Sequence, residues 1–261
     1  MQQHLARFAF AFSMRNLKLV LAYDGTDFCG WQVQPDAPSI QGTLASAIGR
    51  ITGENVLPQG SGRTDAGVHA LTQVANFETE SVIPAANLVV ALNHLLPPAI
   101  RVFECIEVPA NFHARKSVVA KTYRYRIYRG AICPPFLARY VWHYPYPMNL
   151  RAMQRAARFI EGECDFSSFA AVDPEKGRDE KDCTRRILSS RWRRAGEEFV
   201  YEVRGNGFLH HMVRNLVGTF VLAGKGTIQP QDIRRILEAR NRSAAGATAP
   251  ASGLSLVGVE Y

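Results

Sequence analysis

The chain has 261 residues, of which 47% are hydrophobic and 21% are charged, and its formal net charge is +8. This length and apolar content predict a globular protein with a large core and exclude an intrinsically disordered chain. The basic balance favours a polyanionic partner, above all nucleic acid, although many basic proteins bind none.

Strands and helices alternate in the first half of the chain. Residues 1–14 precede any patterned segment, and we expect a disordered leader or a misplaced start codon there, because the apolar stretch is too short for a signal peptide. Ser39 is placed to cap the first helix, and Pro84 to open the second. The predicted order is strand, helix, strand, helix and strand, over residues 17–23, 39–51, 71–77, 84–95 and 100–108.

The second half begins with the clearest strand, 118–128, in which Tyr123 and Tyr125 share one face and Arg124 lies on the other. The proline-rich stretch 130–147 predicts a connection between halves. Asn149 is placed to cap the next helix. There follow a hairpin, an apolar helix, a short helix and a last strand, near residues 186–204, 209–220, 233–237 and 254–261.

This order of elements, with frequent hairpins, predicts an α+β fold with a mainly antiparallel sheet rather than a doubly wound parallel sheet. We expect an N-terminal half over 15–112, a connection over 113–147 and a C-terminal half over 148–261. The halves share a plan, although no residue-level repeat supports a duplication. No apolar run approaches the roughly 20 residues of a membrane span, so no membrane partner is expected.

The segment 60–70 reads GSGRTDAGVHA and is the most informative part of the chain. Its glycines allow a tight turn that projects Arg63 and Asp65 into a cleft. A neighbouring guanidinium favours the ionised form of a carboxylate and can hold its orientation, which suits a carboxylate used as a nucleophile. The alternative is an ordinary glycine-rich turn whose aspartate caps the next segment. A phosphate-loop enzyme is disfavoured, because no GxxxxGK[ST] pattern is present.

Five further segments accompany this loop, and together the six resemble the tRNA pseudouridine synthase A family, in its order and over nearly all of 15–261. They are LKLVLAYDGTDFCGWQ from 17, NFHARKSVVAKTYRYR from 111, DFSSF from 165, GNGFLHHMVRNLVG from 205 and APASGLSL from 249. The resemblance implies isomerisation of uridine to pseudouridine at nucleotides 38, 39 and 40 of the anticodon arm of tRNA. It implies two similar α/β halves sharing one sheet, a basic central cleft, a homodimer in the cytoplasm, and neither metal nor organic cofactor.

The resemblance also assigns roles to residues of the site. Asp65 matches the nucleophile, which attacks the base, attacks the sugar or abstracts a sugar proton. Arg63 is expected to pair with Asp65 and to help hold the nucleotide out of the helix, or to contact phosphate. Tyr123 is expected to stack on the flipped base and relay a proton. The alternative for a strand tyrosine is a half-buried core residue.

Three further residues are substrate-binding candidates. Arg214 would reach a phosphate or support Asp65 by its charge, unless it is a solvated surface residue. Leu254 would line the uracil pocket or belong to the core. Arg124 belongs to a basic set near the proposed site. A second set of basic residues, with acidic residues between them, is a candidate surface for binding RNA phosphates. Its members are Lys176, Arg178, Lys181, Arg185, Arg186, Arg191, Arg193 and Arg194.

No metal site is expected from the sequence. His210 and His211 are neighbours on a predicted helix, where adjacent side chains point in different directions, and no third ligand is suitably spaced. The five cysteines are scattered without a CxxC pair, which argues against structural zinc and disulfides and favours a reducing cytosol. The rival hypothesis is a noncatalytic RNA-binding protein, which leaves Asp65 unexplained because an aspartate repels phosphate.

Overall fold

The alternating leucines near the start of the chain form β1 (Arg15–Tyr23), with Leu17, Leu19 and Leu21 fully buried. In this computed structural model, which describes residues 14–171 and 182–261, β1 lies between two antiparallel neighbours. These are β3 (His69–Thr79) and β4 (Ile100–Val108). The helices α1 (Ile40–Thr52) and α2 (Ala85–Leu95) pack on the leucine face. All five elements predicted for the first half are confirmed.

The C-terminal half also packs helices against antiparallel strands. Its strands are β5 (Ala120–Tyr128), β9 (Glu198–Gly205), β8 (Thr184–Ala195) and β7 (Gly162–Asp165), in that spatial order. Its helices are α4 (Leu150–Arg158), α5 (Met212–Lys225) and α6 (Asp232–Glu238). The rings of Trp192, Tyr201 and Phe220 pack together between the sheet and α5, with centroids 4.9 Å to 6.4 Å apart.

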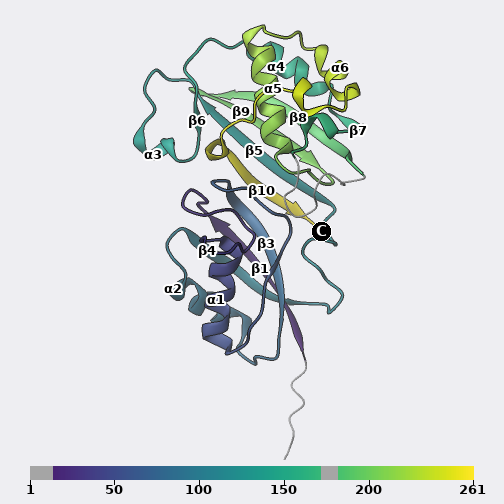
Figure 1. Cartoon of the computed structure of the whole chain (residues 1–261). Helices are drawn as coiled ribbons and strands as arrows, with labels where there is room; N and C mark the ends of the chain where they lie inside the picture. The colour runs from purple at the N-terminus through teal and green to yellow at the C-terminus, as the bar shows by residue number, and fades with distance from the viewer. Residues whose placement is uncertain (1–13, 172–181) are drawn as a thin grey trace, which may run out of the picture.

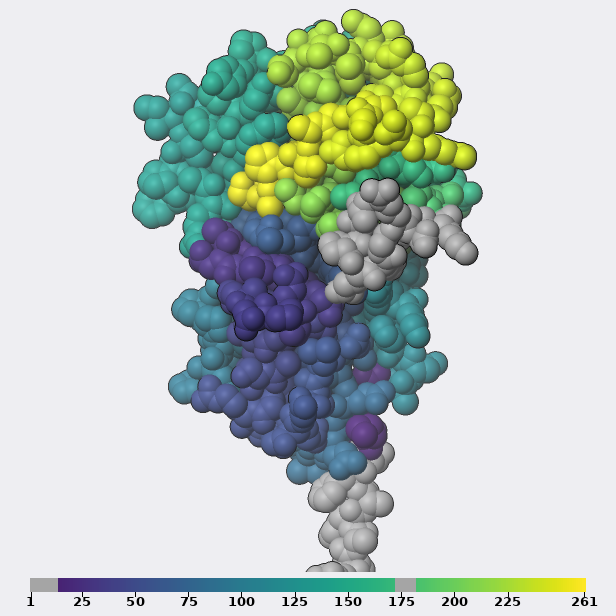
Figure 2. All heavy atoms as spheres, in the orientation of Figure 1, coloured from purple at the N-terminus to yellow at the C-terminus, as the bar shows by residue number. Residues whose placement is uncertain are grey.

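The two halves join through the last strand, β10 (Leu254–Glu260). It pairs parallel to β3 on one side and antiparallel to β5 on the other, which gives the order β4-β1-β3-β10-β5-β9-β8-β7. Figure 1 shows β10 between the lower and upper lobes, and Figure 2 shows the lobes in direct contact across the middle of the molecule. The predicted α+β fold with a mainly antiparallel sheet is confirmed, and β10 makes one of its few parallel pairings.

The proline-rich stretch 130–147 contains α3 (Pro135–Ala138) and β6 (Trp142–His143), which pairs with β5. It also contacts the N-terminal half, since the Tyr140 hydroxyl donates to Asp24 Oδ2 at 3.0 Å. The division into two halves and a connection stays a prediction. The expected leader, except for Met14, and the basic residues Lys176, Arg178 and Lys181 fall outside the described residues. Among the helices that are described, none has the length and apolar character needed to cross a membrane.

Ser39 caps α1, as predicted, because its Oγ accepts a hydrogen bond from the Gly42 amide at 3.2 Å. Ser39→Ala is expected to lower the free energy of unfolding by about 1 kcal/mol, because one amide at the helix start loses its partner. Chemical denaturation measures this. Ser46→Ala, an exposed change within the same helix, is the control and should be neutral or slightly stabilising. Equal effects of the two substitutions would contradict a capping role.

Candidate active site

The loop that carries Asp65 is fixed on both sides of the carboxylate. Thr64 is buried, its hydroxyl lies 2.8 Å from the Tyr23 hydroxyl, and its carbonyl accepts from the Trp31 amide at 3.0 Å. Gly67 turns the chain with φ 75°, a left-handed conformation that favours glycine. Hydrogen bonds of Thr64 and the turn at Gly67 therefore position Asp65 at the cavity.

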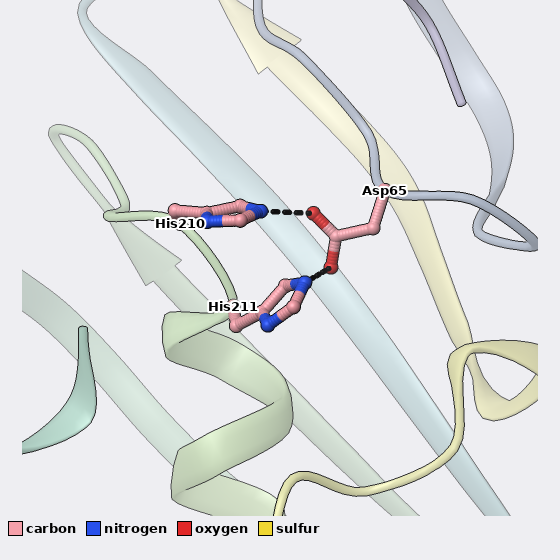
Figure 3. Close-up of side chains that lie close together, drawn as sticks. All are labelled: Asp65, His210 and His211. Atoms are coloured by element: carbon pink, nitrogen blue, oxygen red, sulfur yellow. Dashed lines mark ion pairs between the residues drawn. The ribbon is translucent and has the colours of Figure 1, made fainter. Parts of the chain in front are cut away.

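Asp65 meets three basic side chains from the other half of the molecule, two that immediately precede α5 and one in its first turn. Arg214 Nη1 donates to Asp65 Oδ2 at 2.8 Å. His211 Nε2 lies 3.4 Å from the same oxygen, and His210 Nε2 lies 3.8 Å from Oδ1 (Figure 3). The side chains of Asp65 and Arg214 are only 19% and 15% exposed, so water screens their attraction weakly. The guanidinium compensates the negative charge of Asp65 inside the site.

Arg214 is itself held by the segment that leads into β10. Its Nε donates to the Ala249 carbonyl at 2.8 Å, and the Ala249 amide donates to the Arg214 carbonyl at 3.2 Å. The planar guanidinium thus uses one edge for the backbone and another for Asp65, an arrangement that a lysine cannot reproduce. Of the two roles predicted for Arg214, its position favours support of Asp65 by charge.

The prediction that His210 and His211 lie on a helix and point apart was wrong. α5 begins at Met212, and His211 precedes it with a left-handed φ of 57°. This turn brings both imidazoles toward Asp65, with ring centroids 4.0 Å apart. Burial lowers the pKa of His211 below its usual value, which favours the neutral ring at neutral pH. A positive φ at a non-glycine residue leaves no sequence signal that would have revealed this.

Asp65, His210 and His211 also form a group whose ligand atoms all lie within 4.8 Å of one another, the one such group in the described part of the chain. Imidazole and carboxylate are ligand types for zinc. The third ligand that the sequence lacked at short spacing therefore comes from a distant loop. However, Arg214 already donates to the carboxylate oxygen nearest His211, so a metal ion at that oxygen would face a guanidinium.

Tyr123 and Leu254 lie with Asp65 in a cavity of about 670 Å³ at the junction of the halves. Both side chains are buried, and the Tyr123 ring meets Phe208 edge to face at a centroid distance of 5.0 Å. Burial, together with the charge of nearby Asp65, raises the pKa of Tyr123 far above its usual value, so its phenol stays protonated. A volume of this size is typical of pockets that bind small molecules or single nucleotides.

The cavity also has cationic residues in its lining, in agreement with the expected basic cleft. They come from the Asp65 loop, from the segment before β5, from β5 itself and from β8. They are Arg63, Arg115, Lys121 and Arg185. Arg63 is exposed at the rim. The position of Arg63 is compatible with either of its predicted roles.

Arg124 is not brought together with these residues. It lies on the opposite face of β5 from Tyr123, and its Nη2 donates to Glu202 Oε1 at 2.8 Å. There it lines a separate cavity of about 470 Å³ with Arg126, which pairs with Glu198. The period of two along a strand places alternate side chains on opposite faces, so this separation could have been read from the sequence.

Comparison with known proteins gives consistent matches. A profile described as "tRNA pseudouridine synthase" matches residues 19–115 and 156–261. A protein of Solibacter usitatus named "tRNA pseudouridine synthase A" is 52% identical over 95% of this chain and 100% of its own length. Proteins of the same name from Brevibacillus brevis and Caldicellulosiruptor bescii are 45% and 44% identical, with the same coverage.

Among solved structures, a chain from "Crystal Structure of a Cbf5-Nop10-Gar1 Complex" aligns with 92% of this chain and 57% of its own length. The identity is 11% and the TM-score is 0.36, which is too low a likeness to inform the description of the site.

Proposed function

Because the chain belongs to the tRNA pseudouridine synthase family, we propose that it isomerises uridine to pseudouridine at positions 38, 39 and 40 in the anticodon arm of tRNA, with Asp65 as the nucleophile. The observation that carries the residue assignment is the contact of Asp65 with Arg214 beside a cavity that also holds Tyr123. The profile matches the segments that supply Asp65 and Arg214, and Tyr123 lies between those segments.

A uridine within a helix must leave the base stack before its glycosidic bond can be reached, at a cost of a few kcal/mol. The cavity offers the flipped base an aromatic ring, Tyr123, and an apolar side chain, Leu254. Stacking of a base on an aromatic side chain contributes about 1–3 kcal/mol, which offsets part of that cost. Arg63 at the rim supports the proposal as a group that helps hold the nucleotide out.

The reaction exchanges one bond of the base for another. The bond from the sugar C1′ to N1 breaks, the base rotates, and a bond from C1′ to C5 forms. C5 then releases its proton and N1 gains one, so atoms and electrons balance without an oxidant or a reductant. Asp65 starts this sequence by attack on the base, by attack on the sugar or by removal of a sugar proton. In all three, Arg214 fixes the carboxylate and Tyr123 supplies a protonated hydroxyl.

A noncatalytic RNA-binding protein is the competing function. It explains the cationic lining of the cavity and its aromatic side chains, yet it gives no reason for a carboxylate among them. Near an RNA backbone a carboxylate repels phosphate, and this one is held by Arg214 and by the fixed backbone at Thr64. Chemistry on a flipped base is the use that fits this placement.

Incubation with an unmodified tRNA transcript that carries uridines tritiated at C5 tests the proposal. Isomerisation replaces the hydrogen on C5, so tritium is expected in the solvent and pseudouridine at positions 38 to 40. Reverse-transcription mapping after carbodiimide labelling locates the product. Transcripts without uridine at these positions are the control and should release no tritium. Tight binding without tritium release from several substrates would favour the RNA-binding protein instead.

A homodimer and a cytoplasmic location, both implied by the resemblance, remain part of the proposal. Light scattering of the purified chain with and without tRNA would measure the assembly.

A further inference from the structure

The lining of the cavity around Asp65 combines two kinds of side chain. Tyr123, Phe208 and Leu254 are aromatic or apolar. Lys121 and Arg115 are cationic. The only carboxylate among the described lining residues is Asp65, whose charge is matched by Arg214. Those residues therefore include no second carboxylate for Lys121 and Arg115.

Lys121 is the most enclosed of these cations. It lies on the same face of β5 as Tyr123, two residues earlier, which separates the two by about 6.6 Å along the strand. Its ammonium rests against Gly62 of the Asp65 loop, where a side-chain Cβ would come within 2.7 Å of Nζ. The absence of a side chain at position 62 thus leaves the space that Lys121 Nζ occupies, three residues from Asp65.

The surroundings of Lys121 contain cations and no matching anion. Its backbone pairs with β9 and β10, but its ammonium has no hydrogen-bond or ion-pair partner among the residues that the structure describes. Burial and the nearby charge of Arg115 lower the pKa of Lys121 to about 8. The other titratable groups that face the same cavity are Cys29, Arg63 and Asp65 from the N-terminal half, Tyr123 from β5, Arg185 from β8, and His210 and His211. A partly desolvated ammonium beside another cation is unfavourable, and an anion placed between them would relieve that cost.

We propose that Lys121 binds the phosphate of the flipped uridine itself, so that the cavity holds the whole target nucleotide with its base at Tyr123 and its phosphate at Lys121. The proposal rests on the proposed function and deepens it by assigning a subsite. A base, its sugar and its own phosphate are linked within one nucleotide, and the short separation of Lys121 from Tyr123 fits one nucleotide rather than a distant part of the RNA. Lys121 is thus a positioning residue that sets the sugar over Asp65.

A chemical double-mutant cycle tests this assignment. RNA hairpins of the anticodon arm are prepared with an uncharged methylphosphonate on the 5′ or on the 3′ side of the target uridine. Their affinities are measured with Asp65→Asn protein, which prevents turnover. Lys121→Met alone should weaken binding about 10- to 100-fold, the range for a hydrogen bond to a charged group. The methylphosphonate at one of the two positions should alone weaken binding by a similar factor. The two changes together should weaken it no further.

Lys116→Met is the matched control, because Lys116 is an exposed lysine of the preceding segment and lies outside this cavity. It should show no coupling to either methylphosphonate. If the loss of affinity from Lys121→Met added to the loss from the methylphosphonate at both the 5′ and the 3′ position, the assignment would be overturned. Tritium release by the wild-type protein is measured alongside, so that a failure of the subsite is distinguished from a failure of the proposed function.

The acidity of the Lys121 ammonium provides a second test. Because the free lysine loses its proton as the pH rises through about 8, RNA affinity should fall about tenfold between pH 7 and pH 9. Lys121→Arg keeps its charge throughout this range and should retain the affinity while losing the pH dependence. An identical fall in affinity for Lys121→Arg would show that another group is responsible and would overturn the proposal.

Discussion

Replacement of Asp65 with asparagine is expected to lower the rate of pseudouridine formation by at least about 10⁴-fold, while tRNA affinity stays the same or increases slightly. Asparagine has nearly the same shape but is neither a nucleophile nor a base, and losses of this size follow removal of a nucleophile from an enzyme. The affinity should not fall, because the change removes a negative charge from a cavity that receives a polyanion. Single-turnover tritium release and a binding titration measure the two effects.

Asp36→Asn provides a matched control on the exposed surface. Asp36 has a positive φ of 56°, which asparagine tolerates, so this variant should fold and react like the wild type. If Asp65→Asn retained more than about 1% of the wild-type rate, Asp65 could not be the nucleophile. If it lost tRNA binding along with activity, the carboxylate would have a structural role.

Arg214→Met should lower the single-turnover rate by about 10²- to 10³-fold with little change in tRNA affinity, which is the usual loss when one preorganised donor is removed from an active site. The physical reason is the 2.8 Å hydrogen bond from Arg214 to Asp65, which is mostly shielded from water. Without it the carboxylate is free to turn toward His211 or away from the substrate. Arg214→Lys should be intermediate, because one ammonium cannot hold both Asp65 and the Ala249 carbonyl.

Arg151→Met is the control for Arg214→Met, because Arg151 is an exposed arginine on α4. Thermal unfolding of each variant separates a loss of catalysis from a loss of folded protein. A large drop in tRNA affinity with an unchanged rate for bound substrate would instead assign Arg214 to phosphate binding, the other role that its sequence context allows.

The order of elements could be predicted from the sequence because the signals are local. Leucines at every second position predicted β1, and apolar residues three and four apart predicted α1, α2 and α5. Ser39 and Asn149 cap their helices as expected, since a cap depends on residues within one turn. The short elements β2 (Gln59–Gly60), β6, β7 and α3 were not predicted, because two to four residues carry too little periodicity.

The site could be predicted from the sequence only through the resemblance. Asp65 and Arg214 are 149 residues apart, and no local pattern joins them. The placement of His210 and His211 depends on one left-handed residue, and that of Lys121 on the missing side chain of Gly62. Such features arise from the packing of two halves against each other, which periodicity does not encode.

The position of β10 in the chain has a consequence for biosynthesis. This strand is translated after every other strand, yet it lies between β3 and β5 and follows the segment that holds Arg214. Until residues 249–260 have left the ribosome, the N-terminal half has no partner edge to pair with, and Asp65 has no fixed guanidinium. A nascent chain would therefore carry a basic surface without an assembled active centre. The enzyme becomes competent to modify tRNA only after β10 has been synthesised and paired.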